Sequence, residues 1–205
     1  KQMKMSDLKT LITSSVLIIA VALYLIFAPD NTSSPSDNGE QIVTQAEAIE
    51  ATGNELQAVE FVSANDGDTI NVMLNGKKER VRLLMVDTPE MNYDKGEPMP
   101  YAEEAKDFTI NLLENATNIE LLFDVGDERD SYDRLLAYVF VDDVLLQEAL
   151  LKEGLAAVRY IHEPNNSLEE KFREAQEVAA SNKLNIWETD NYFKDGRFDE
   201  SFTAE

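Results

Sequence analysis

Three segments of the sequence bring acidic and arginine side chains to turns or strand ends, where they can act together on a ligand. The first is Asp66-Gly67-Asp68-Thr69, in which a glycine lets two carboxylates point the same way. The second is the block from Arg82 to Glu90, and the third runs from Asp130 to Arg134, directly ahead of an apolar run. Asp and Glu oxygens are the ligands that Ca²⁺ and Mg²⁺ prefer, so this set of residues suits a hard cation.

A proline determines the expected geometry of the second block. In a flat strand Arg82 and Asp87, five residues apart, would face opposite sides. Pro89 holds Thr88 extended and ends the strand, which frees Asp87 to turn toward the same rim as Arg82. The Thr88 carbonyl leaves the strand ladder for the same reason and becomes available to a cation.

Each segment, taken alone, also has an ordinary structural explanation. Asp-Gly pairs are common in turns between strands. Arg82 could simply form an ion pair with Asp87 or Glu90 at a strand end. Arg134 could be a surface arginine in an acidic neighbourhood. Only the three segments together favour a functional site.

The amino-acid composition limits the kinds of catalytic site that the chain can form. The chain of 205 residues has no cysteine, one histidine and a net charge of −22. Without cysteine there can be no disulfide, zinc–thiolate site or cysteine nucleophile, and a single histidine excludes most histidine-dependent hydrolytic sites. Carboxylates and arginines must therefore carry any catalysis. A polyanionic substrate would need a local basic patch, because the overall field repels it.

The N-terminal part has the pattern of a targeting segment. Leu11 to Ala28 is an uncharged run, with lysines before it and acids after it. We expect residues 1–28 to form a hydrophobic helix that serves as an uncleaved signal anchor or as a cleaved signal peptide. The charge pattern orients the rest of the chain outward, so we expect an extracytoplasmic protein, held at the membrane through residues 11–28 if they are kept. Residues 29–54 are expected to form a flexible linker, of which the first part is rich in polar and small residues. The second part, from Gln41, could form a helical turn or two that Gly53 and Asn54 stop.

The remaining pattern predicts an α+β domain over residues 55–190. Expected strands cover residues 55–64, 69–74, 80–86, 119–123 and 135–141, and expected helices cover 101–115, 144–153 and 167–182. Asn75-Gly76 is a strong hairpin signal, and Ser167 begins the pattern of a capping box. Five antiparallel strands with three helices favour a small barrel of the oligonucleotide-binding type, an OB-type β-barrel. The acidic C-terminal tail, residues 191–205, could dock on the domain or stay loose.

In this order and spacing the segments resemble the thermonuclease, or staphylococcal-nuclease-like, family. The matching pieces are DGDT, RLLMVDTPE, SYDRLLAYVF, QEALLKEGLA, YIHEPNN and NKLNIW. The resemblance covers about Glu55 to Asp190. It implies a five-stranded barrel with three helices that hydrolyses DNA and RNA with Ca²⁺ and leaves 3′-phosphate ends.

The resemblance also implies roles for the residues of the three segments. Asp68, Asp87 and the Thr88 carbonyl would bind the calcium ion, with Asp66 supporting them. Glu90 would be the general base for the attacking water. Arg82 and Arg134 would hold the phosphate and stabilise charge on the phosphorus, since guanidinium groups can span two phosphate oxygens.

Further residues would bind the substrate. In and near this set, the sequence departs from the family pattern at three positions. By the resemblance, the substrate-binding residues are Lys95, Tyr132, Tyr160 and His162. His162 stands where the family usually has tyrosine, while Asp133 and Leu135 replace the glycines that usually flank Arg134. We expect a monomer.

Two other functions stay open. One is a nucleic-acid- or protein-binding module of the same fold with weak or lost activity. The other is an acidic, surface-tethered scaffold, which would leave the three segments unexplained.

Overall fold

The computed structural model describes residues 43–92 and 96–202, which lie in one compact unit beginning at Gln41. The predicted anchor and the first part of the predicted linker, residues 1–42, lie outside the described residues. In the described ranges, no helix combines the length and the apolar character that a membrane crossing requires.

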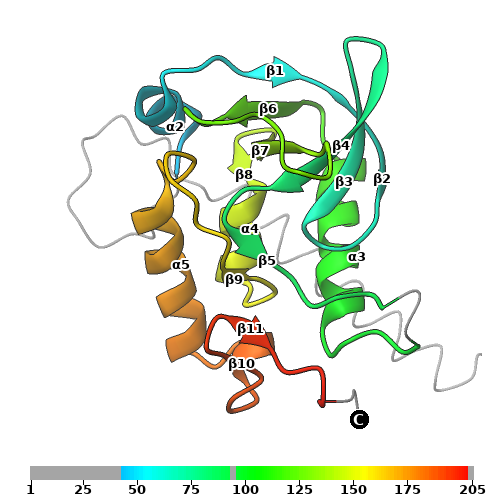
Figure 1. Ribbon diagram of the computed structural model, residues 1–205, viewed down its shortest axis with the longest axis vertical. Coiled ribbons are helices and arrows are strands. Elements are labelled where there is room, and N and C mark those ends of the chain that lie inside the picture. Colours follow the sequence, from blue (N-terminus) through cyan, green and yellow to red (C-terminus); the bar gives the residue numbers. More distant parts are fainter. Residues whose placement is uncertain (1–42, 93–95, 203–205) are drawn as a thin grey trace, which may run out of the picture. The chain divides into compact units, whose positions relative to one another are not determined.

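A mixed sheet forms the centre of this unit (Figure 1). Its seven strands are β1 (Gln57–Ala58), β2 (Glu60–Ala64), β3 (Thr69–Leu74), β4 (Lys77–Leu83), β6 (Ile119–Phe123), β7 (Leu135–Val141) and β8 (Val144–Leu145). Their order is β1-β6-β7-β4-β3-β2, with β8 paired to β7.

The predicted closed, antiparallel, five-stranded barrel is not what the structure shows. Within the described residues β1 and β2 end the path of paired strands, and β4 pairs with β7 in parallel. A parallel pair needs a long crossover, and the chain between β4 and β7 supplies one that includes a helix and β6. Sequence patterns located most of the strands but could not tell which of them would become neighbours.

The hairpin between β3 and β4 confirms the Asn75-Gly76 signal. Both residues have positive φ, 51° and 78°, as a two-residue hairpin turn requires. The register runs from Leu74 opposite Lys77 to Thr69 opposite Arg82. This register brings Arg82 to the end of the strand pair, beside the Asp66–Thr69 turn.

The strand expected over residues 80–86 is interrupted. Strand β4 ends at Leu83, and Met85 has φ 59°, so the backbone turns before a new strand begins. That strand, β5 (Val86–Asp87), pairs with β9 (Ala157–Val158) in a separate two-stranded sheet. The backbone of Asp87 is therefore paired with β9 and not with a strand of the main sheet.

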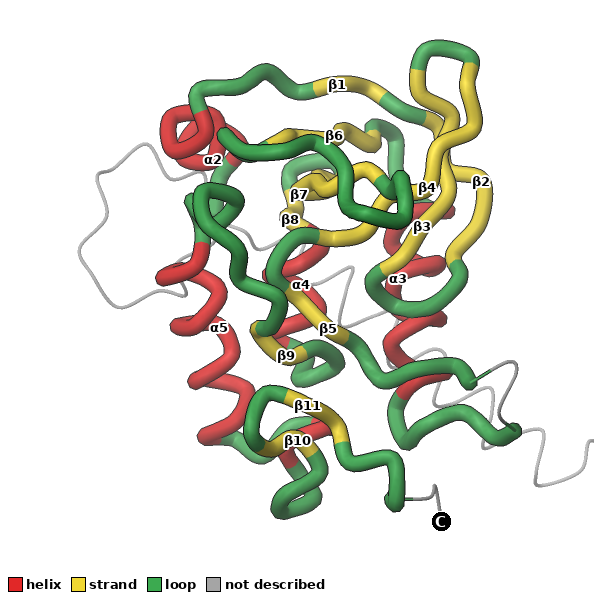
Figure 2. The backbone as a smooth tube through the Cα atoms, in the orientation of Figure 1, coloured by secondary structure: helices red, strands yellow, loops and turns green. Residues whose placement is uncertain are grey.

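Among the described residues four α-helices pack around the sheet, one more than the three predicted for the domain. They are α2 (Gln45–Thr52), α3 (Ala102–Glu114), α4 (Leu146–Lys152) and α5 (Glu169–Ser181), and a short 3₁₀ turn covers Asn185–Trp187. Figure 2 shows α4 between α3 and α5, and it packs against both. In α3, Ala105 and Leu113 are buried in the main core, the larger cluster of buried apolar side chains, and the partly buried Phe108 and Leu112 pack against it.

Helix α2 lies in the second part of the predicted linker, where a helical turn or two had been possible, and this part is folded. A capping box between Thr44 and Glu47 begins the helix, and Gly53 ends it in the left-handed conformation. Val43 and Ala48 lie in the main core, and the Val43 amide donates to Glu148 Oε2 at 2.8 Å. Residues 43–54 thus belong to the folded unit, because a few apolar side chains in a polar segment find a buried site.

The capping box expected at Ser167 does not form. Helix α5 has Leu168 at its N-cap without a side-chain cap, because the Ser167 hydroxyl donates to Asp124 Oδ1 instead. After α5 the C-terminal tail is docked. It forms a second hairpin of β10 (Phe193–Lys194) and β11 (Arg197–Phe198).

Candidate active site

Arg82 lies at the centre of the predicted site and is only 8% exposed. Its Nε is 3.1 Å from Asp68 Oδ1, and its Nη2 is 3.1 Å from Asp87 Oδ1. Its Nη1 donates to the carbonyls of Leu83 (2.8 Å) and Val86 (2.6 Å). One guanidinium group therefore joins the Asp66–Thr69 turn to the end of β5.

The turn and the strand end also contact each other directly. Asp68 Oδ2 accepts hydrogen bonds from the Thr88 amide at 2.8 Å and from the Thr88 hydroxyl at 3.2 Å. Gly67 allows this approach, since a Cβ there would lie 2.8 Å from Thr88 Cγ2 and 2.9 Å from Ala105 Cβ. The Gly67 carbonyl is held by the Thr109 hydroxyl of α3 at 2.7 Å. The structure thus brings together the acidic residues that the sequence proposed as cation ligands.

The carboxylates of this group repel one another. Burial, together with the charges of Asp68 and Glu90, raises the pKa of Asp66 to about 7. Burial and the charge of Asp68 raise the pKa of Asp87 to about 6, although Arg82 opposes the change. Burial disfavours the charged form of Arg82, but the carboxylates around it outweigh that effect and raise its pKa. Burial is the largest cause of both rises in carboxyl pKa, and the repulsion between the carboxylates adds to it.

Arg159 is a member of the site that the sequence analysis did not find. It follows β9, the partner of β5, and its Nη1 lies 2.7 Å from Asp87 Oδ2. Its guanidinium carbon is 4.5 Å from the Tyr160 ring centre, and that of Arg82 is 5.4 Å from it. The two oxygens of Asp87 are thus bound by two arginines. Only its position next to Tyr160 in the YIHEPNN block could have pointed to Arg159.

A cavity of about 140 Å³ adjoins Arg82 and contains most of the predicted phosphate- and nucleotide-binding side chains. Its lining residues are Arg82, Leu83, Leu84, Met85, Asp130, Arg134, Leu136, Tyr160, His162 and Asn165. The two predicted phosphate-binding arginines, Arg82 in β4 and Arg134 in the loop before β7, therefore line one cavity. The exposed ring of Tyr160 stands at the same cavity.

Arg134 is held by an acidic partner in the loop before β7. Its Nε lies 2.7 Å from Asp130 Oδ2, while Asp130 Oδ1 accepts the amides of Tyr132 and Arg134. The Tyr132 side chain is 74% exposed, and its ring centre is 5.5 Å from the Arg134 guanidinium carbon. Asp133 pairs with Arg129 at 3.4 Å, so its charge is directed partly away from Arg134.

Glu90 and Lys95 are the remaining predicted site residues. Glu90 is exposed, and it is near enough to Asp66 for its charge to raise the Asp66 pKa. Lys95 lies outside the described residues. In residues 43–92 and 96–202 no three acidic, histidine or cysteine side chains gather as a metal-binding group. The predicted calcium site would use only two carboxylates, Asp68 and Asp87, with the Thr88 carbonyl.

Known proteins are similar to this chain in sequence. The family model described as "Staphylococcal nuclease homologue" matches residues 80–189. A thermonuclease from Staphylococcus hyicus is 33% identical over 180 residues, which cover 86% of this chain and 97% of that protein. The chain belongs to the staphylococcal nuclease homologue family.

Two relatives from Bacillus subtilis (strain 168) are more similar but longer. Endonuclease YncB is 50% identical over 129 residues, or 63% of this chain and 61% of that protein. The SPbeta prophage-derived endonuclease YokF is 45% identical over 144 residues, or 70% of this chain and 48% of that protein. The chain thus spans about half to three fifths of the length of these two relatives.

Proposed function

We propose that this protein is a Ca²⁺-dependent nuclease that hydrolyses phosphodiester bonds of DNA, RNA or both and leaves 3′-phosphate ends. The observation that carries the proposal is the position of Arg82. It contacts Asp68 and Asp87 on one side and lines a cavity with Arg134 on the other. The relatives named endonuclease and thermonuclease support the same class of reaction.

The chemistry of the acidic residues fits calcium. Asp68 and Asp87 offer hard carboxylate oxygens, and both lie within hydrogen-bond distance of the same guanidinium group. A bound calcium ion would supply Lewis-acid stabilisation of the charge on a phosphate. Asp66, whose charge repels that of Asp68, would support the ion from the turn. Thr88 would contribute its carbonyl.

The protein side chains then have separate tasks in hydrolysis. Arg82 and Arg134 would bind the non-bridging oxygens of the phosphate in the cavity, where negative charge grows during in-line attack. Asp130 holds Arg134 in the loop before β7. A bound phosphate would then accept a hydrogen bond from one N–H group of Arg134 in place of Asp130. Glu90, exposed at the end of the Arg82–Glu90 block, would accept the proton of the attacking water. Tyr160 and His162 would contact the nucleotide.

One observation favours a second candidate, a binding module without activity. Both predicted phosphate-binding arginines already have protein carboxylates as partners, Arg82 with Asp68 and Asp87, and Arg134 with Asp130. If these pairs persisted with nucleic acid present, the site would bind weakly and not cleave.

Cleavage of supercoiled plasmid, with calcium and with EDTA, separates the two functions. We expect nicking with calcium and none with EDTA, and a loss of about a hundredfold in Arg134→Lys. Arg173→Lys is the matched control, because Arg173 also binds a carboxylate four residues away through Nε, at 2.8 Å, but on the exposed face of α5. Binding of DNA without nicking would favour the binding module, and equal loss in both variants would remove Arg134 from the site.

We further propose that the domain acts outside the cytoplasm. The support is the uncharged run from Leu11 to Ala28 with lysines before it. Separation of membrane and soluble fractions, with protease added to intact cells, tests this proposal. Protein that is protected from the protease in intact cells would contradict it.

A further inference from the structure

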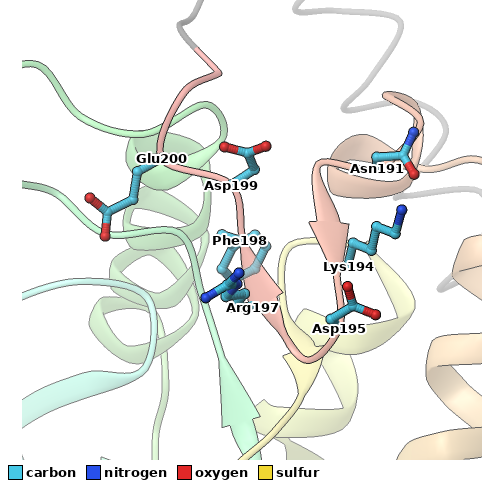
Figure 3. Close-up of a pocket in the computed structure, with 7 residues that line it drawn as sticks. All are labelled: Asn191, Lys194, Asp195, Arg197, Phe198, Asp199 and Glu200. Atoms are coloured by element: carbon cyan, nitrogen blue, oxygen red, sulfur yellow. The ribbon is translucent and has the colours of Figure 1, made fainter.

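The docked C-terminal tail contributes to a second apolar cluster, distinct from the main core. We call this cluster the C-terminal core, and its buried members are Met99, Ala102, Ala157, Ile186, Tyr192 and Phe198. The family match ends at residue 189, so the hairpin of β10 and β11 lies beyond it. Figure 3 shows this hairpin and the mostly polar side chains that line the pocket beside it.

Tyr192 is the centre of the C-terminal core. It is 1% exposed, and its ring centre is 5.3 Å from that of Phe198 and 5.6 Å from that of Phe202. On its other side the ring of Tyr101, at the start of α3, lies 6.3 Å away. The aromatic residues of the tail are thus packed against the segment that enters α3.

Hydrogen bonds connect Tyr192 to the predicted general base. The Tyr192 hydroxyl donates to the carbonyl of Pro100 at 2.7 Å. The adjacent Met99, itself in the C-terminal core, donates its amide to the carbonyl of Glu90 at 3.0 Å. Met91, which follows Glu90, also packs against this core. The Glu90 carbonyl and the following Met91 are therefore linked to the tail, through Met99 and the C-terminal core.

The same core reaches the strand that carries Asp87. Ala157 is a buried member of the C-terminal core, and in β9 it is the register partner of Asp87 in β5. Two segments that bring separate residues to the candidate active site, one with Glu90 and one with Asp87, thus rest on one apolar cluster. The tail completes that cluster with Tyr192 and Phe198.

We propose that Tyr192 is a positioning residue for Glu90, and that the C-terminal hairpin supports the segments that carry the active-site residues of this nuclease. This inference rests on the proposed function, because it assigns Tyr192 a role in the same reaction. The Met99 amide and the packing of Met91 fix the backbone at Glu90, and that backbone determines where its carboxylate stands relative to the attacking water. A displacement of about 1 Å in such a geometry can cost roughly a hundredfold in rate.

Tyr192→Phe in the full chain tests the proposal, since it keeps the ring and removes the bond to Pro100. We expect kcat to fall roughly fivefold to twentyfold with less than about a twofold change in KM. We also expect the Met99 amide to exchange its hydrogen several times faster, measured by hydrogen exchange of the peptide that contains residues 96–101. In a Glu90→Gln background, Tyr192→Phe should lower kcat no further.

Tyr138→Phe is the matched control. Tyr138 is also a fully buried tyrosine, but its hydroxyl donates to Asp124 Oδ2 at 2.6 Å in the main core. We expect it to lower the melting temperature while kcat and the exchange of residues 96–101 stay unchanged. If Tyr192→Phe is too unstable to assay, Tyr101→Phe replaces it, because the Tyr101 ring packs against Tyr192 and its hydroxyl donates to Glu188, just ahead of the tail, at 3.0 Å.

The outcomes separate the two proposals. Unchanged kcat and unchanged exchange at residues 96–101 in Tyr192→Phe would overturn the positioning role. A fall in kcat that is equally large without Glu90 would also overturn it. If the wild type shows no calcium-dependent cleavage, the proposed nuclease function fails. Faster exchange in Tyr192→Phe would then still show that the tail holds the Glu90 segment.

Discussion

Arg82→Lys is the most informative single change, because Arg82 has a structural and a proposed catalytic role. Its guanidinium contacts Asp68, Asp87 and two backbone carbonyls, and the side chain is 8% exposed. Lysine keeps the positive charge but not the planar arrangement of donors. Some of these partners must then lose their hydrogen bond inside the protein.

The expected cost follows from those contacts. Removing one partner of a buried ion pair costs about 3–5 kcal/mol. Each hydrogen bond to a charged group contributes about 1.5–3 kcal/mol. Since lysine keeps the charge and one or two contacts, we expect a loss of about 2–3 kcal/mol in the free energy of unfolding. For a domain of this size that corresponds to a fall of roughly 5–10 °C in Tm. An exposed ion pair at a strand end would contribute only about 0–1 kcal/mol.

Urea unfolding in EDTA measures this loss without a contribution from bound calcium. The fluorescence of Trp187, the single tryptophan, reports the transition. Turnover of the same preparation in calcium should fall roughly a hundredfold, since one ammonium group cannot span two phosphate oxygens. Arg80→Lys, two residues earlier on β4 and exposed, is the control and should change the free energy by less than about 0.5 kcal/mol. Equal stability in the two variants would refute the buried network, and normal turnover of Arg82→Lys would refute its catalytic role.

Three further predictions follow from the structure. Asp87→Asn should weaken calcium binding by roughly tenfold or more in titration calorimetry. Glu90→Gln should change calcium affinity little but lower kcat about a hundredfold. Equal effects of the two variants on calcium affinity would contradict these assignments. Deletion of residues 1–40 should leave Tm and turnover unchanged, because the compact unit begins at Gln41. Deletion of residues 1–54 should lower Tm, because it removes α2 from the main core. Equal Tm values of the two truncated proteins would place α2 outside the fold. Gly154→Ala should lower the free energy of unfolding by about 2 kcal/mol or more in urea unfolding. Gly154 has φ 65°, and the added Cβ would lie against the carbonyl of Leu184. A loss below about 0.5 kcal/mol would contradict that close approach.

Local sequence determined the elements whose signals lie within a few residues. The turn at Asn75-Gly76 formed as predicted, because that pair adopts the positive φ angles of a two-residue hairpin. The expected strands at residues 69–74, 119–123 and 135–141 agree with β3, β6 and β7 in both bounds. The acidic turn and the Arg82–Glu90 block were also found from sequence, because their residue types and spacing are themselves the signal.

Only the tertiary structure decided which of these elements meet. The parallel pairing of β4 with β7 and the pairing of β5 with β9 join segments far apart in the chain. Arg159 reaches Asp87 only through the second of these pairings, so no spacing in the sequence could indicate it. The burial of Arg82 likewise depends on all the segments around it, and it turns an apparent strand-end ion pair into a buried network. Side-chain periodicity reports which face of an element is apolar, but the partner of that face is selected by packing of the whole domain.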